Sequence, residues 1–531
     1  MNFIRSVASC LLINLAVLCA AGAARAEAIL RVGAPSEPET IDPAKSTGLF
    51  EGKIEAELFE GLLSRDATGR SIPGAAQSWD ISADGLVYTF HLRPDLKYSN
   101  GEPIVAGDFV YGLRRLVDPA TGSENGLEVD AVANALEIES GKIKDLTQLG
   151  AAAPDDRTVV ITLRRPSIRL IDYAIDYYPL RQADIERYGS DWTRPGKLVG
   201  NGAFVLAEWV PQSHVALRRN PFYREAATVK LDGVRYIASG SPETALKMFR
   251  ADELDIAELP KTQIEWAKRN LTATLKAEPQ IGCFMIGLNA GAPPFNDGRL
   301  RRALALVIDQ DAVTEKIVRG DQVPAHGFIP PLIPGYPAVS ENFTGKPMAD
   351  RIAEAKKLYA EAGYGPGKPL RVQLMLAKGR EWDHWTLAIA GMWHDALGVE
   401  ATLDTQEWQV YLGRLNHHDF TAAVDDWVTL IQAPALLDEY RSTSASNEVQ
   451  YKSVAFDEAV TAADSAPDLP TEYARYAAAE RLLLDGQAII PIYHPVTHAL
   501  VAERVHGWIA NPADSHRSRF ISLVPQAAAK P

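Results

Sequence analysis

The chain has 531 residues, of which 47% are hydrophobic and 23% charged. This composition is typical of a soluble globular protein, and the length is too great for one ordinary hydrophobic core, so we expect two or more packed lobes. The excess of 68 acidic over 54 basic residues argues against a nucleic-acid-binding protein, whose affinity depends on a basic surface.

The N-terminus has the pattern of a secretory signal peptide over residues 1–26. A positive charge at Arg5 precedes an apolar run over residues 7–20, and small residues lead to Ala26, so we expect cleavage before Glu27. The apolar run of about 14 residues is shorter than the roughly 20 that span a bilayer. The sequence therefore predicts an exported protein without a retained anchor.

Removal of this segment changes both the charge and the cysteine count. The remaining chain has 52 basic and 68 acidic residues, a net charge of −16, and of the three cysteines it keeps only Cys283. A single cysteine cannot form an internal disulfide, even in an oxidising compartment. Because Cys283 lies in the apolar run IGCFMIGLN, we expect a buried and unreactive thiol.

The most strongly patterned stretch covers residues 72–110. Over residues 86–92 apolar side chains alternate with more polar ones, which predicts a strand with one wholly apolar face. Asn100-Gly101 predicts a hairpin turn, and Asp108 is placed where a helix would start. No side chain here is arranged for catalysis, so we interpret the stretch as scaffold.

Elsewhere the apolar spacing changes repeatedly between the strand and helix periods, which predicts an α/β protein. We expect strands at residues 29–32, 159–163, 203–210, 214–218, 234–237, 255–257, 280–289, 370–376, 399–403 and 420–428, and further strands within 489–501. We expect helices at residues 47–63, 110–117, 242–250, 348–362, 383–397 and 471–485, one capped by Asn296-Asp297, and one opening over 406–411.

Catalytic, cofactor and metal motifs are missing from the sequence. It contains no Gly-x-Ser-x-Gly, His-Glu-x-x-His or paired Cys-x-x-Cys. Gly200-Asn201-Gly202 lacks the third glycine of a dinucleotide loop, and GYGPGKPL at residues 363–370 lacks the Ser or Thr of a phosphate loop. We interpret His417-His418-Asp419 as a solvated turn and expect no metal and no cofactor. Asp425-Asp426 could form a carboxylate pair for acid–base catalysis, but no nucleophile accompanies it.

Four separated segments resemble the family 5 extracytoplasmic solute-binding proteins, the oligopeptide- and dipeptide-binding group that supplies ABC importers. Three of them are VGNGAF with RNPFY, the short element ADELDI, and a strand followed by Pro-Phe-Asn-Asp and a helix. Together they cover essentially the whole chain after the signal peptide. The first and most specific is an ordered string within residues 72–110: Trp79, Asp84-Gly85, Tyr88, Phe90, Leu92-Arg93, Ser99-Asn100-Gly101, Pro103 and Asp108-Phe109.

The resemblance implies a two-lobe α/β periplasmic binding protein fold, type II, in the large peptide-binder variant with an extra sub-domain and a hinge of crossing strands. We expect lobe I to comprise residues 27–59, 180–281 and 494–531. The extra sub-domain would cover residues 60–179, and lobe II would cover residues 282–493.

The implied function is that of the periplasmic substrate-binding component of an ABC importer. Such a protein binds oligopeptides or related peptide-like solutes between its lobes by backbone strand addition and delivers them to a membrane permease. We expect a monomer without enzymatic activity and without nucleic-acid partners. The alternative is a secreted hydrolase acting on peptides or glycans.

The resemblance also implies the ligand-binding residues. It predicts backbone edges at Gly48-Leu49 and at Asp426-Trp427-Val428, and pocket walls at Trp408 and Trp427. His384, at the start of a predicted helix, could meet a ligand carboxylate.

One position departs from the family pattern. In the oligopeptide binders an Asp pairs with the α-amino group of the ligand, and alignment through Trp427 and Pro434 puts Leu430 at that position. A buried ammonium group without a counter-charge costs several kcal/mol, so Leu430 cannot replace the Asp. Either Asp425 or Asp426 binds the amine, or the ligand is not a standard oligopeptide. The sequence does not distinguish between peptides, murein peptides, opines and other amphoteric solutes as the ligand.

Overall fold

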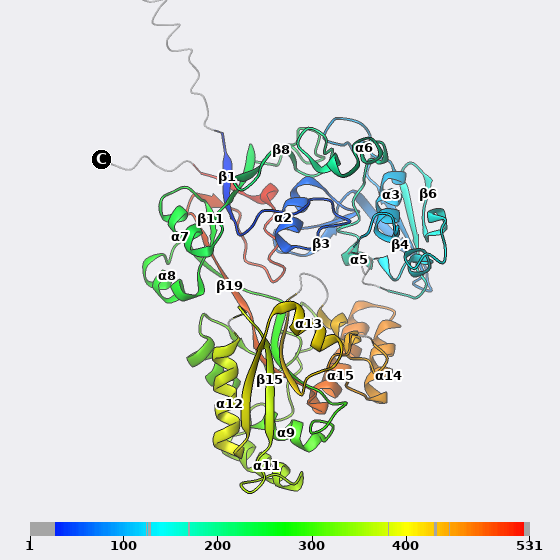
Figure 1. Ribbon diagram of the computed structural model, residues 1–531. Helices are drawn as coiled ribbons and strands as arrows, with labels where there is room; N and C mark the ends of the chain where they lie inside the picture. Colours follow the sequence, from blue (N-terminus) through cyan, green and yellow to red (C-terminus); the bar gives the residue numbers. More distant parts are fainter. Residues whose placement is uncertain are drawn as a thin grey trace, which may run out of the picture.

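The computed structural model describes residues 27–524, apart from 124, 126–128, 168–169, 381, 429–432 and 445. Figure 1 shows two bodies joined by crossing segments. The upper body, lobe I, contains both ends of the described chain, and the lower body, lobe II, contains β15 and α12. The expected signal peptide lies outside the described residues.

Lobe I is built on a seven-stranded mixed sheet with the strand order β12-β19-β11-β1-β10-β9-β8. β1 runs parallel to both β10 and β11, and the remaining pairs are antiparallel. The predicted strand–helix–strand unit is therefore present, with β1 inserted between its two strands. The strands are β1 (Ile29–Ala34), β8 (Phe204–Val210), β9 (His214–Arg219), β10 (Gly233–Ala238), β11 (Ile256–Glu258), β12 (Leu275–Pro279) and β19 (Val496–Val501).

Short helices cover this sheet. α7 begins at Pro242 because the side chain of Ser241 accepts a hydrogen bond from Thr244 N, and proline suits the first helical turn. The helices and the small hairpin of this lobe are α2 (Leu49–Leu58), α6 (Gln182–Tyr188), η3 (Gly189–Thr193), α7 (Pro242–Arg250), η4 (Lys261–Gln263), α8 (Ile264–Asn270), η7 (Ser518–Phe520), β20 (Val505–His506) and β21 (Ser522–Leu523).

A four-stranded antiparallel sheet, β4-β5-β7-β6, forms a separate core beside lobe I. The predicted strand at 86–92 is β5, with Tyr88, Phe90 and Leu92 all buried on one face. The predicted turn is also confirmed, since Gly101 has a φ of 87°. The elements are β2 (Leu63–Arg65), β3 (Ser71–Pro73), β4 (Ala76–Ile81), β5 (Val87–Leu92), α3 (Ala106–Val117), α4 (Ala135–Glu139), η2 (Leu146–Gln148), β6 (Ala151–Asp155), β7 (Thr158–Thr162) and α5 (Leu170–Tyr173).

Lobe II is built on a six-stranded sheet with the order β14-β18-β13-β17-β15-β16, packed between helices (Figure 1). Cys283, at the start of β13, is buried in its core, and burial raises the pKa of the thiol, as expected for an unreactive cysteine. The strands are β13 (Gly282–Leu288), β14 (Val323–Pro324), β15 (Arg371–Ala377), β16 (Glu400–Gln406), β17 (Ala422–Val428) and β18 (Ile489–His494). The helices are α9 (Gly298–Leu306), α10 (Gln310–Ala312), η5 (Val313–Val318), α11 (Met348–Glu361), α12 (Asp383–Leu397), α13 (Trp408–Asn416), η6 (Ala433–Tyr440), α14 (Val454–Asp464) and α15 (Leu469–Gly486).

Two adjacent crossings connect the lobes. The chain passes from β12 to β13 on the way out and from β18 to β19 on the way back. The crossings are bonded to each other, because Gln280 N donates to Pro495 O at 2.8 Å. Asp321 of lobe II also contacts Lys268 and His498 of lobe I at 2.6 and 3.1 Å. Two short bonded crossings are the construction expected of a hinge.

Helix boundaries differ from the sequence prediction at one functionally relevant point. The helix predicted over residues 47–63 ends at Leu58, so Gly61 lies beyond the helix. A Cβ atom at Gly61 would lie 2.1 Å from the carbonyl oxygen of Ile175. Glycine is therefore required there for close backbone approach, which local periodicity does not report.

No helix in the described part of the chain is both long and apolar enough to cross a membrane.

Candidate functional site

The face of lobe II directed at lobe I is formed by the carboxyl ends of three parallel strands. β15 runs parallel to β16 and to β17. Loops at such ends form the usual ligand crevice of open α/β sheets. Here β15 is followed by Arg380, β16 is followed by Trp408 at the start of α13, and β17 ends at Val428.

These loops bring together a cation, an aromatic ring and a carboxylate. The guanidinium carbon of Arg380 lies 4.2 Å from the ring centroid of Trp408. Nη1 of the same side chain lies 3.6 Å from Oδ1 of Asp426. Trp408 stacks on Tyr411, with centroids 5.6 Å apart, and is 38% exposed. The cluster offers a ligand one apolar face and both signs of charge.

The charge on Asp426 is influenced from both lobes. Burial raises the pKa of its carboxyl group, and the positive charges of Arg380 and Lys261 oppose that rise. Lys261 belongs to η4 of lobe I, whereas Asp426 belongs to β17 of lobe II. The carboxyl group of Asp426 is therefore near enough to lobe I to be affected by its charge.

β17 has a backbone edge that its neighbour leaves unpaired. Its pairing with β13 extends over the whole strand, but its pairing with β15 stops at Ala423 among the described residues. Two backbone groups beyond that point are held by side chains. Asp426 N donates to Asp425 Oδ1 at 2.9 Å, and Val424 O accepts from the Tyr411 hydroxyl. An edge of this kind can accept an extended ligand.

Asp425 differs from Asp426 because it is enclosed among other carboxyl groups. Burial, followed by the nearby charge of Glu448, raises the pKa of Asp425 well above its ordinary value. Burial and Glu448 likewise raise the pKa of Glu439 to about 7. Asp425 Oδ1 accepts from Asp426 N, so this side chain serves the strand edge as a hydrogen-bond acceptor.

The other expected site residues lie in different surroundings. Trp427 points away from the cation–aromatic cluster, with its ring 5.1 Å from that of Phe328. Val428 is exposed at the end of β17, and His384 is exposed in the first turn of α12. Leu430 lies outside the described residues.

On lobe I, Gly48 caps the N-terminus of α2 and Leu49 is its first residue. Leu49 is 63% exposed, so its side chain is available to contact a solute. Both residues line a cavity of about 340 Å³ between lobe I and the sub-domain.

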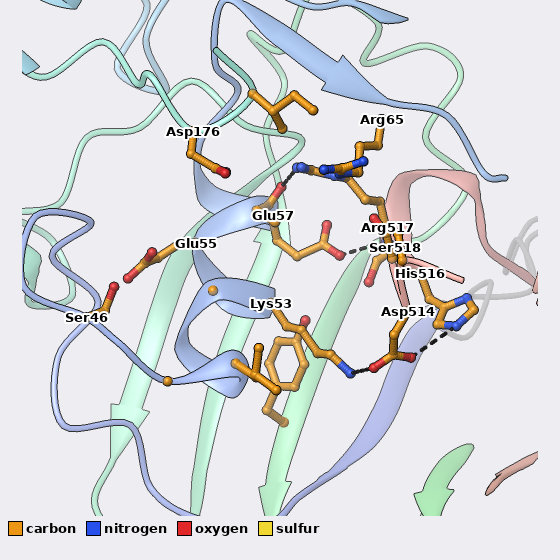
Figure 2. A pocket seen from close by; sticks show the side chains of 18 of the residues that line it. Ser46, Lys53, Glu55, Glu57, Arg65, Asp176, Asp514, His516, Arg517 and Ser518 are labelled. Carbon is orange, nitrogen blue, oxygen red and sulfur yellow. Dashed lines mark hydrogen bonds and ion pairs between the residues drawn. The ribbon is translucent and has the colours of Figure 1, made fainter. Parts of the chain in front are cut away.

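Sequence reasoning did not find the polar wall of this cavity. Figure 2 shows Ser46, Glu55 and Asp176 on one side of α2, and Lys53 and Asp514 on the other. The only local signal was a pair of acidic residues beside the apolar positions of the α2 helix. Burial of Glu55 and Asp176 depends on distant segments, which periodicity cannot detect.

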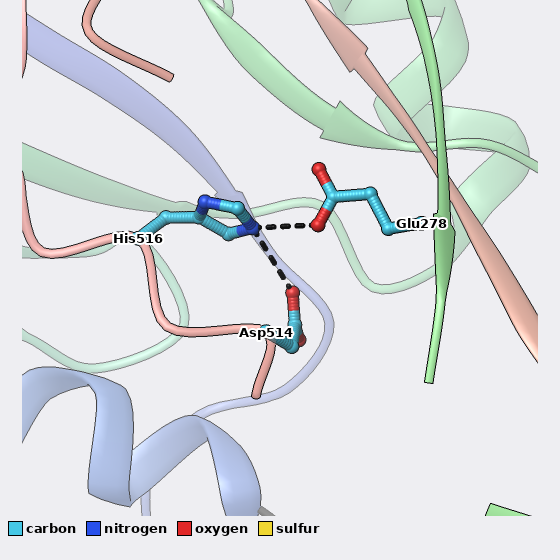
Figure 3. A group of neighbouring side chains, drawn as sticks. All are labelled: Glu278, Asp514 and His516. Carbon is cyan, nitrogen blue, oxygen red and sulfur yellow. Dashed lines mark hydrogen bonds and ion pairs between the residues drawn. The ribbon is translucent and has the colours of Figure 1, made fainter. Parts of the chain in front are cut away.

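A second group links the C-terminal segment to β12. Figure 3 shows His516 between Glu278 and Asp514, with its Nε2 atom 2.7 Å from one carboxylate and 3.4 Å from the other. Trp508 Nε1 donates to the remaining oxygen of Glu278 at 2.6 Å, and Lys53 pairs with Asp514 at 2.6 Å. The three ligand-type atoms lie within 4.8 Å of one another. Their hydrogen bonds to one another and to neighbours account for this arrangement without a metal ion.

Two α/β lobes, two crossings and a polar, aromatic face at the strand ends define a two-lobe solute-binding protein. Residues 70–448 match the bacterial extracellular solute-binding proteins, family 5 (middle region), and the chain belongs to this family.

Relatives and solved structures extend the match over nearly the whole chain. The periplasmic oligopeptide-binding protein OppA of Escherichia coli K12 is 34% identical, covering 92% of this chain and 91% of that protein. The probable deoxycholate-binding periplasmic protein YgiS of the same organism is also 34% identical, over 92% of each chain. The unliganded open form of the murein tripeptide-binding protein MppA superposes with a TM-score of 0.85, at 32% identity, covering 94% of this chain and 98% of that one. Haemophilus influenzae OppA in complex with the peptide RPPGFSPFR gives 0.76, at 30% identity and 94% and 99% coverage. The expected family and two-lobe fold are confirmed.

Proposed function

We propose that this protein is the periplasmic substrate-binding component of an ABC importer and binds oligopeptides or related peptide-like solutes between its lobes. The observation that carries the proposal is the unpaired edge of β17 beyond Ala423, next to the Arg380–Trp408–Asp426 cluster. Relatives named as oligopeptide-binding and murein peptide-binding proteins support the same class of solute.

An extended solute would add to this edge as a strand. In the structure, Asp425 Oδ1 accepts the hydrogen bond from Asp426 N. A backbone carbonyl oxygen of the ligand would replace Asp425 Oδ1 as the acceptor. The Gly48-Leu49 segment would cover the solute from lobe I. Main-chain hydrogen bonds provide affinity without selecting side chains, so solutes of varied sequence can be accepted.

Hinge closure would couple binding to delivery. The better superposition on an open, unliganded relative supports an open state here. A ligand that contacts both lobes binds the closed form better and shifts the population toward it. The closed form then docks on a membrane permease, which is the expected partner.

The distribution of charged groups at the end of β17 supports a second class of solute, other than a standard free oligopeptide, equally well. Leu430 lacks the carboxylate expected for an α-amino group, and Asp425 is enclosed among other acids. Asp426 already has Arg380 beside it at 3.6 Å. The relative named for deoxycholate shows that this family also includes a protein described for a non-peptide solute.

The remaining expectations belong to the same proposal. The chain would be exported after cleavage before Glu27, act as a monomer and catalyse no reaction. The lobes would divide at residues 27–59, 180–281 and 494–531 for lobe I, 60–179 for the sub-domain and 282–493 for lobe II. N-terminal sequencing of protein recovered from the periplasm tests the cleavage site, and a start other than Glu27 contradicts it.

Native mass spectrometry of the purified protein, followed by denaturation, tests the function. We expect an intact peptide-like solute to be released, and small-angle scattering to record compaction when that solute is returned. Turnover of added peptides or glycans, or no compaction with the recovered solute, would overturn the proposal. Family membership supports a binding protein over the alternative of a secreted hydrolase.

A further inference from the structure

The cavity beside Leu49 contains a buried carboxyl group with an unused oxygen. Glu55 is only 5% exposed and lines the cavity. One of its oxygens, Oε1, has no hydrogen-bond partner. The hydroxyl group of Ser46 lies beside the carboxyl group (Figure 2) and opposes the rise that burial causes in its pKa. Buried polar atoms without partners are rare and costly, so this oxygen indicates a missing donor.

Negative charge surrounds this oxygen. The strongest charges acting on Glu55 are the carboxylates of Asp176, Asp42 and Glu51, and all three disfavour its ionised form. These three residues belong to different segments. Asp176 follows α5, Asp42 lies in the loop before α2, and Glu51 is in the first turn of α2.

The cations of this region are engaged elsewhere. Arg115 donates to both oxygens of Asp42 at 2.9 and 2.8 Å. Arg517 and Arg65 act on Asp176, where they oppose the rise that burial causes in its pKa. Among the described residues, Glu55 is therefore a buried carboxyl group whose strongest charged neighbours are all anionic.

The rest of the cavity wall combines apolar and charged side chains. Leu30 and Val32 of β1, Tyr236 of β10 and Ile256 of β11 supply the apolar part, together with Trp508. The charged part includes Lys53, Arg65, Asp514 and Arg517. A volume of about 340 Å³ falls within the range of small-molecule sites. The unpartnered oxygen of Glu55 beside these apolar residues fits an apolar body that ends in a positive charge.

We propose that this cavity binds a primary ammonium group carried on an apolar body, with Glu55 as its counter-ion. As a subsite for the imported solute, it rests on the proposed function, in which the solute lies between the lobes against Leu49. It supplies from lobe I the carboxylate that Leu430 does not supply from lobe II.

Proton release gives this subsite a specific signature. In the empty protein, burial raises the pKa of Glu55 to about 8, so the group is mostly protonated at pH 7. Ammonium binding favours the ionised form and expels the proton. Apparent affinity therefore rises about tenfold from pH 6 to pH 7 and levels off above pH 8.

Calorimetry with 2-phenylethylamine and 2-phenylethanol tests the subsite, because the two probes share a body and differ in charge. We expect the amine to bind more than about tenfold tighter than the alcohol, as for a hydrogen bond to a charged group. Its binding heat at pH 7 should depend on the ionisation enthalpy of the buffer, because a proton is released.

Two carboxylate variants sharpen the test. Glu55→Gln should remove both the preference for the amine and the proton release, whereas Glu361→Gln, which neutralises an exposed carboxylate of α11 in lobe II, should change amine affinity by less than about threefold. Equal binding of the two probes, no binding of the amine, or a pH-independent affinity would each overturn the inference. The pH dependence of amine affinity in the wild-type protein tests the inference even if Glu55→Gln fails to fold.

The two proposals fail separately. If the recovered solute compacts the protein but the amine does not bind, the subsite is wrong and the importer function stands. If the amine binds with the expected pH profile and no solute causes compaction, the cavity is an amine site and the importer function is wrong.

Discussion

Arg380 and Asp426 approach to 3.6 Å although 46 positions separate them in the chain. Arg380 follows β15 and Asp426 is near the end of β17, so the contact exists only because these two strands run parallel in one sheet. The same guanidinium group lies over Trp408. The contact lies on the surface of lobe II that we propose binds the solute.

Replacing Arg380 should alter the ionisation of Asp426. Burial raises the pKa of that carboxyl group and Arg380 opposes the rise, so Arg380→Gln should raise the pKa further. Carboxyl-carbon NMR titration measures this directly. Lys378→Gln is the matched control, since Lys378 pairs with the exposed Glu407 instead. A pKa for Asp426 that falls or stays constant in Arg380→Gln would contradict the assignment.

Leu49 should contribute to solute affinity through its exposed side chain. Leu49→Ala removes most of the contact between this side chain and the solute, so it should weaken binding by about 1 kcal/mol, roughly fivefold. Leu387→Ala is the control, because both leucines are 63% exposed and both lie near a helix start. Titration calorimetry with the recovered solute compares the two variants. Equal losses, or none, would mean that Leu49 does not touch the solute.

Glu60 should be essential for the stability of lobe I. Its carboxylate accepts from Arg224 at 2.6 Å, Arg519 at 2.7 Å and Tyr223 at 2.8 Å. Glu60→Ala leaves Arg519 without its counter-ion and leaves Arg224 with only the more exposed Glu225, so we expect a loss of about 3 to 5 kcal/mol in the free energy of unfolding. Urea denaturation measures it, with the exposed Glu361→Ala as control. A loss as small as that of the control would be inconsistent with a buried network.

His516 should stabilise the fold most at low pH. Burial lowers the pKa of its ring, but Asp514 and Glu278 outweigh burial and leave the pKa raised. The stabilisation is fully present below the unfolded value of about 6.5 and is lost as pH rises through the folded pKa. The difference in unfolding free energy between wild type and His516→Gln should therefore shrink from pH 5.5 to pH 8.5.

The exposed His394 provides the control for this pH dependence. His394→Gln should leave the difference from wild type nearly constant over the same range. A difference for His516→Gln that grows with pH would show that the ring is neutral in the folded protein.

Local patterns in the sequence were enough for most elements and for the family. Alternation predicted β5, and apolar spacing predicted α7 and α12 with the bounds that the structure has. The helix predicted to reach residue 63 ends at Leu58, and Gly61 beyond it is required by the close approach of the carbonyl oxygen of Ile175. A glycine alone does not reveal whether it ends a helix or admits another segment.

The sequence by itself determined most of the secondary structure and the family, because periodicity and turn chemistry are local. Only the tertiary structure decided which charged groups are buried and what they meet. Glu55 is isolated by Asp176 and Asp42, and Glu278 meets His516 across 238 positions. Desolvation and pairing depend on packing between segments distant in the chain, so the same carboxylic acid can be a solvated surface group or a site for a cation.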